Sequence, residues 1–126
     1  MQFIAPETAL PVGALVFENS ADVLAQAEEV RRHPLVVLQF PKWTDGRAYS
    51  QAVLLRGRLR YAGEIRAIGE VMADMLPLLR RCGFDAVQMR ADQKLETAQR
   101  ALGVFDNHYQ TVPPERSVLT APGTLQ

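Results

Sequence analysis

The chain has 126 residues, of which 48% are apolar and 22% are charged, and its formal net charge is zero. A chain of this length and composition is expected to fold as one globular domain that buries most of its apolar surface. A net charge of zero excludes an overall field that would recruit nucleic acid or an anionic membrane. We therefore expect neither of them as a partner.

The charges are unevenly placed along the chain. Residues 31–90 contain 11 Lys and Arg against 5 Asp and Glu, a local excess of +6 that the two ends balance. This excess indicates either a local surface that attracts anions or a solvated, arginine-rich rim. The alternating Arg56, Arg58 and Arg60 lack the interleaved aromatic residues of a nucleic-acid motif.

The N-terminus and the cysteine content bear on the compartment. Residues 1–6 have neither a basic start nor a long apolar core, so they are not a secretory signal. No segment approaches the ~20 apolar residues that span a bilayer. The single cysteine, Cys82, cannot form an intrachain disulfide. Together these features predict a cytoplasmic protein.

The first half of the chain shows two short apolar runs, each followed by a helical pattern. Residues 13–17 predict a strand, and Ser20 offers an N-cap to the helix that follows. The run at 35–40 is nearly all apolar without alternation, which is typical of a strand covered on both faces in a parallel sheet. Thr44 or Asp45 is expected to cap the next helix.

The second half repeats this pattern twice. A strand is expected at 65–68, followed by a short helix at 75–82 with Asp74 as its cap. Another strand is expected at 86–89, and Asp92 is expected to cap the last helix.

Strands that alternate with helices predict an α/β fold with a parallel sheet and right-handed crossovers. Four βα units form either an open flavodoxin-like sheet or half of a barrel. We expect residues 1–110 to be a single α/β domain and the proline-rich residues 111–126 to be a flexible C-terminal tail or arm. An open sheet has exposed edges, which favours a homodimer.

The loop that follows the strand at 35–40 is the best candidate site. Ligands of parallel sheets gather at the carboxyl ends of the strands, and this loop combines cationic donors with a helix N-terminus that favours an anion. A small anion or a phosphorylated ligand is therefore expected. The alternative is a purely structural cap and turn with solvated cations. The candidate ligand-binding residues are Lys42, Thr44, Asp45, Gly46, Arg47 and Arg90.

Several chemistries lack their motifs. The chain has no P-loop and no glycine-rich dinucleotide fingerprint, and two distant histidines make a poor metal site. We therefore expect no bound metal and no cofactor, and we assign no catalytic residue. A small enzyme on a half-barrel, with Asp92 or Glu70 as general base, remains an alternative.

Four motifs together carry a family resemblance. They are Phe40-Pro-Lys-Trp-Thr-Asp-Gly-Arg-Ala-Tyr-Ser50, Leu54-Leu-Arg56 with Gly63-Glu-Ile-Arg-Ala-Ile-Gly69, Arg81-Cys-Gly-Phe-Asp85, and Tyr109-Gln110. From about residue 35 to 110 the chain resembles an uncharacterised bacterial family, a domain of unknown function (number 934). Its members are often labelled oxidoreductases involved in sulfite reduction, because their genes neighbour those of assimilatory sulfite reductase.

This resemblance implies a role in sulfur assimilation, and the residues limit what that role is. Sulfite reductases use a sirohaem coupled to an iron–sulfur cluster, and a cluster needs about four thiolates. One cysteine cannot supply them, and no redox dithiol is present. The resemblance therefore implies an accessory protein that binds an anionic metabolite. An interaction module that docks on sulfite reductase without a ligand site is the alternative.

Overall fold

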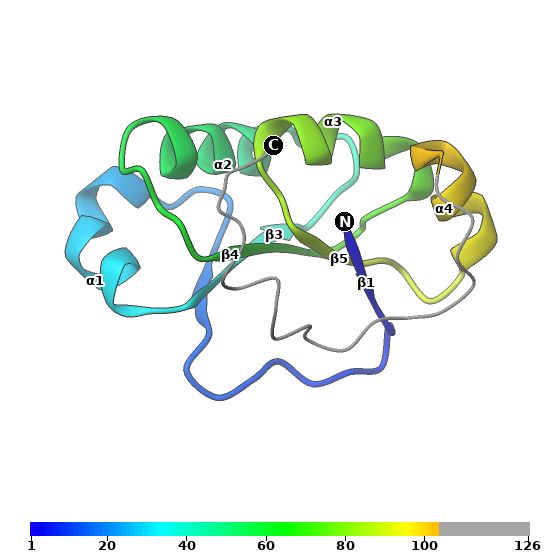
Figure 1. The fold of residues 1–126 in the computed structure, drawn as a ribbon, viewed down its shortest axis with the longest axis horizontal. Helices are drawn as coiled ribbons and strands as arrows, with labels where there is room; N and C mark the ends of the chain where they lie inside the picture. Colours follow the sequence, from blue (N-terminus) through cyan, green and yellow to red (C-terminus); the bar gives the residue numbers. More distant parts are fainter. Residues whose placement is uncertain (104–126) are drawn as a thin grey trace.

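Five parallel strands form one sheet in the computed structural model, which describes residues 1–103 (Figure 1). From one edge to the other the strand order is β1-β5-β4-β3-β2. The strands are β1 (Gln2–Ile4), β2 (Leu15–Phe17), β3 (Leu35–Phe40), β4 (Glu64–Gly69) and β5 (Ala86–Gln88). The predicted α/β class and parallel sheet are confirmed.

The four predicted βα units are present, and they wind in one direction. Each connection from β2 to β5 leads to the next strand in the sheet, so right-handed crossovers place the helices on one face. Figure 1 shows this layer of helices above the sheet and the connection from β1 to β2 below it. A flavodoxin-like sheet places strands on both sides of its first strand, whereas here β1 is an edge strand and the strand order from β2 to β5 runs in one direction. The helices are η1 (Val23–Gln26), α1 (Ala27–Arg32), α2 (Arg47–Gly57), η2 (Ala73–Met75), α3 (Leu76–Cys82) and α4 (Leu95–Leu102).

Strand β3 lies at the centre of the hydrophobic core. It has the predicted bounds, and all of its residues except Gln39 are buried. Successive side chains of a strand point to opposite faces, so an unbroken apolar run fits a strand covered on both sides. On the helical face, the Phe40 ring meets Tyr49 of α2 edge to face, with ring centroids 5.1 Å apart. Tyr49 is thus a packing residue of the core.

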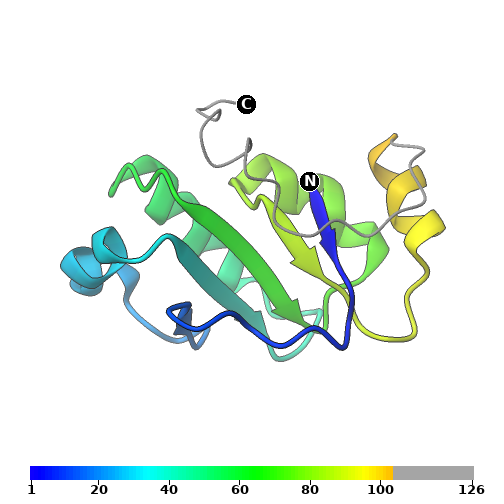
Figure 2. The same cartoon turned by 60° about the horizontal axis from the view of Figure 1, so that its bottom comes forward.

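Strand β1 is an element that the sequence did not reveal. It pairs in parallel with β5, with Phe3 opposite Val87. The connection that follows it is tied to the sheet by Gln88, whose side-chain amide donates to the carbonyl oxygens of Ala5, Pro6 and Thr8 at 3.1, 3.2 and 2.7 Å. Figure 2 shows this connection running past the carboxyl ends of the central strands.

Four predicted helix caps are wrong. Gly46 is the N-cap of α2 in place of Thr44 or Asp45, although the Asp45 carboxylate accepts the backbone N–H of Arg47 at 3.1 Å. Asp22 replaces Ser20 as the cap of η1, because its carboxylate accepts two backbone N–H groups of the first turn at 3.1 and 3.3 Å. Asp74 lies inside η2 instead of ahead of it. Asp92 makes no cap hydrogen bond to α4, because its carboxylate is paired with Arg90.

Residues 104–126 lie outside the part of the chain that the structure describes. The predicted tail at 111–126 and the predicted end of the domain at residue 110 fall there, so both stay predictions. Within residues 1–103, no helix is both long enough and apolar enough to cross a membrane.

Candidate functional site

The predicted loop lies at the carboxyl edge of the sheet, between β3 and α2. Its side chains Lys42, Thr44 and Arg47 are exposed, whereas Asp45 is half-buried. Trp43, which belongs to the first of the family motifs, has 52% of its surface exposed. The loop therefore presents a large aromatic side chain next to cations.

Asp45 organises this loop. Its carboxylate accepts the Arg47 guanidinium through Nη2 at 2.8 Å and through Nε at 3.2 and 3.3 Å. It also accepts the backbone N–H of Arg47 at 3.1 Å and the side-chain amide of Asn19 at 2.7 Å. These donors, Arg47 first among them, hold the pKa of Asp45 well below its usual range. The protein's own carboxylate thus occupies the helix-opening position at which an external anion was predicted.

The charge of Arg90, the sixth predicted ligand-binding residue, is also neutralised by a carboxylate of the same chain. Its guanidinium pairs with Asp92, and its Nε lies 3.0 Å from Oδ1 of that carboxylate. Among residues 1–103, no hydrogen bond or ion pair joins Arg90 to residues 42–47. Glu70 lies between them: its carboxylate accepts the backbone N–H of Trp43 at 3.4 Å, and its charge adds to that of Asp92 in raising the pKa of Arg90.

The carboxylates proposed as a general base have structural partners. The Arg90 guanidinium lowers the pKa of Asp92, which makes this carboxylate a weaker base. Glu70 anchors the loop at Trp43. In the described part of the chain, no three His, Cys, Asp or Glu side chains are grouped so that they would hold a metal ion. Burial raises the pKa of the Cys82 thiol, which fits a packing residue rather than a nucleophile.

We describe two hollows on the surface of residues 1–103, and residues 42–47 line neither of them. One, of about 330 Å³, lies where the connection after β1 crosses the ends of β4 and β5, and Arg90 lines it together with Gln88. The other, of about 520 Å³, lies at the opposite, amino edge of the sheet. We call it the amino-edge hollow; its lining residues are Arg31, Arg32, His33, Pro34, Leu59, Arg60, Tyr61, Ala62 and Gly63.

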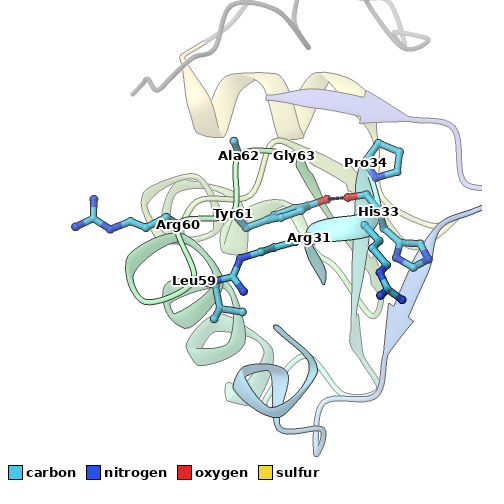
Figure 3. Close-up of a pocket in the computed structure, with 9 residues that line it drawn as sticks. Arg31, His33, Pro34, Leu59, Arg60, Tyr61, Ala62 and Gly63 are labelled. Atoms are coloured by element: carbon cyan, nitrogen blue, oxygen red, sulfur yellow. Dashed lines mark hydrogen bonds between the residues drawn. The ribbon is translucent and has the colours of Figure 1, made fainter. Parts of the chain in front are cut away.

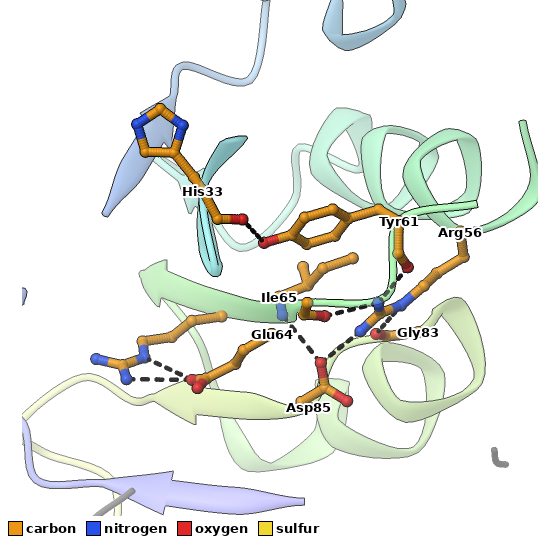
Figure 4. A network of polar contacts seen from close by, with 9 residues as sticks. His33, Arg56, Tyr61, Glu64, Ile65, Gly83 and Asp85 are labelled. Atoms are coloured by element: carbon orange, nitrogen blue, oxygen red, sulfur yellow. Dashed lines mark hydrogen bonds and ion pairs between the residues drawn. The ribbon is translucent and has the colours of Figure 1, made fainter. Parts of the chain in front are cut away.

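A polar network supports the wall of the amino-edge hollow (Figure 4). Arg56 of α2 donates to the backbone carbonyls of Tyr61, Gly63 and Gly83 at 2.7, 2.8 and 3.0 Å, and it forms an ion pair with Asp85. The Asp85 carboxylate also accepts the backbone N–H at the start of β4 at 2.9 Å. Residues from three separate segments of the family motifs therefore meet at the side chain of Arg56.

Two positions of this network require glycine, because neighbouring atoms lie too close to leave room for a side chain. A Cβ on Gly63 would lie 2.3 Å from the Tyr61 hydroxyl and 2.8 Å from the carbonyl oxygen of Pro34. A Cβ on Gly83 would lie 2.5 Å from the Cγ atom of Arg56, and Gly83 has φ +109°. No side chain fits at either position without displacing its neighbours.

The fold and the polar network define a singly wound, parallel α/β domain whose two strand-end edges carry different side chains. The sequence matches the model of a family described as "Bacterial protein of unknown function (DUF934)" over residues 14–119, which is most of the chain. The chain belongs to this family, as the motifs predicted. No curated protein and no solved structure matches it.

Proposed function

We propose that this protein is an accessory factor of assimilatory sulfite reduction that docks on the reductase through the loop at the carboxyl edge of the sheet. We infer the docking surface from Trp43. Its side chain is 52% exposed, and its backbone N–H donates to the Glu70 carboxylate. The sulfite-reduction part of the proposal rests on the label that members of the family carry.

An exposed tryptophan on an anchored loop suits protein contact. Aromatic residues are enriched at protein interfaces, and tryptophan is among the residues that contribute most to binding. Both ends of the loop are anchored, Trp43 by Glu70 and Arg47 by Asp45. A loop that is already ordered loses little conformational entropy on binding.

The internal ion pairs favour docking over capture of a small anion at this edge. The Nε and Nη2 atoms of Arg47 are already bonded to Asp45, and those of Arg90 to Asp92, so the nearby carboxylate offsets the charge that would attract an anion. A small anion at either arginine would also lie close to that carboxylate, which repels it. The predicted anion site at Lys42, Thr44, Asp45, Gly46, Arg47 and Arg90 stays a prediction, which sulfite or sulfate titration of the wild type and Arg47→Ala tests.

Substitution of Trp43 by alanine tests the docking surface. We expect Trp43→Ala to weaken binding to purified assimilatory sulfite reductase by about 30-fold in biolayer interferometry, because loss of a hot-spot side chain costs about 2 kcal/mol. The matched control is Leu78→Ala, a side chain of α3 that is 41% exposed and does not belong to the loop.

Leu78→Ala should bind as the wild type does. If the wild-type protein does not bind the reductase at low salt, or if both variants bind with equal affinity, docking through this loop is refuted.

A further inference from the structure

We infer that the amino-edge hollow binds an organic anion that carries a phosphate group. Its volume of about 520 Å³ falls within the range of small-molecule sites, roughly 300–1,000 Å³. It lies at the edge opposite the Trp43 loop, so this inference does not depend on the docking proposal.

The charge of the hollow is the first reason. Of the nine lining residues within the described part of the chain, three are arginines and none is Asp or Glu. Arg32 is paired with Glu29 at 3.1 Å, whereas Arg31 and Arg60 have no ion pair within residues 1–103. Guanidinium groups bind phosphate through two parallel N–H donors, so two unpaired arginines at one hollow suit this ligand.

The apolar wall is the second reason. Figure 3 shows the Tyr61 ring with its hydroxyl directed at the backbone of His33, to whose carbonyl oxygen it donates at 2.7 Å. This bond and the Arg56 contacts hold the ring in place. Pro34 is exposed and Leu59 is half-buried, so both offer apolar surface beside the cations, whereas Tyr61 is 8% exposed and supports them from the core. This apolar surface suits the organic part of a phosphorylated molecule better than a bare inorganic ion.

The backbone of Arg60 is the third reason. Arg60 has φ +56°, the one positive φ among the non-glycine residues of the described chain. A side chain is strained in this left-handed region, and glycine would relieve the strain. Arg31 and Arg32 lie in the last turn of α1, where a cation interacts favourably with the helix dipole, but Arg60 lies beyond the end of α2 and has no such role. Figure 3 shows the Arg60 side chain extended away from the hollow, so it reaches a phosphate bound there only after a change of rotamer.

The test is isothermal titration with ATP and with pyrophosphate, both without Mg²⁺, at about 0.15 M salt. We expect ATP to bind more tightly than pyrophosphate, because only ATP has an organic part to contact the wall. Arg60→Gly and Arg31→Gln should each weaken ATP binding about 10-fold, the effect of losing one charge-assisted contact. Arg60→Gly should also keep or raise the Tm, which separates lost binding from misfolding.

Arg81→Gln is the matched control, because Arg81 is an exposed arginine of α3 that does not line the hollow. This variant should bind ATP with the affinity of the wild type. Unchanged ATP affinity in both hollow variants would overturn the inference. So would a dissociation constant above about 10 mM for ATP, or NMR shifts confined to residues 42–47. Preferential binding of a polyglutamate peptide would assign the surface to an acidic protein instead.

Discussion

Arg56 connects segments that are far apart in the sequence. It holds the backbone after α2, the entry to β4 and the turn before β5 through three carbonyl oxygens and one carboxylate. The sequence alone suggested only that Arg56 belongs to a line of arginines with Arg58 and Arg60. Its stem passes so close to Gly83 that a Cβ there would lie 2.5 Å away. This arginine is therefore part of the fold rather than of a binding surface.

Gly63→Ala tests this network at its tightest point. The added methyl group would lie 2.3 Å from the Tyr61 hydroxyl, so either the hydrogen bond to His33 breaks or the backbone shifts. We expect the free energy of unfolding to fall by about 2 kcal/mol or more in urea denaturation. Gly57→Ala is the control, because a Cβ at Gly57 meets nothing within 4 Å. Equal stability of the two variants would contradict the account of the network.

Asp45 gives a second prediction at this scale, in its pH dependence. Because Arg47 lowers its pKa from the ordinary 3.8, the pairing stabilises the native state above pH 3.8 and is lost as the pH falls below that value. An NMR titration should show the Asp45 carboxyl titrating below 3.8 in the wild type and returning toward 3.8 in Arg47→Gln. An ordinary pKa in the wild type would show that Arg47 does not hold the carboxylate.

At the scale of elements, the agreement between sequence and structure follows the strength of the local pattern. The bounds of β3 were predictable because a continuous apolar run has few other uses. Strand β1 was missed because its three residues are too few to show a hydrophobic periodicity. The pairing of Asp45 with Arg47 and the amino-edge hollow were also missed. The pairing depends on the directions of two side chains, and the hollow is formed by segments about 30 residues apart. A local sequence motif shows neither.

The connection between β1 and β2 gives a prediction for an element. Gln88 is the buried residue that holds residues 5–8 through three carbonyl oxygens. We expect Gln88→Leu to speed amide exchange across residues 5–14 by about 10-fold or more, since these hydrogen bonds are lost and the segment opens more often. Gln39→Leu is the control, because Gln39 donates to Phe17 at the end of β2 instead. Unchanged exchange at 5–14 in Gln88→Leu would show that other contacts hold the segment.

The whole molecule has its helices on one face and two different strand-end edges (Figure 1). The carboxyl edge has an exposed tryptophan and ion pairs that neutralise its arginines, and the amino edge has a hollow with two arginines outside any ion pair of the described chain. On this division rest the two proposals, docking at the carboxyl edge and ligand binding at the amino edge. The short edge strands β1 and β2 are also the surfaces at which the predicted homodimer would form.

Hydrogen exchange of the protein with and without purified assimilatory sulfite reductase tests the central claim most directly. Docking through the carboxyl edge predicts slower exchange in residues 41–47 when the reductase is present, and unchanged exchange in residues 59–63 of the amino edge. The absence of protection at 41–47, with or without protection elsewhere, would contradict the proposed docking surface.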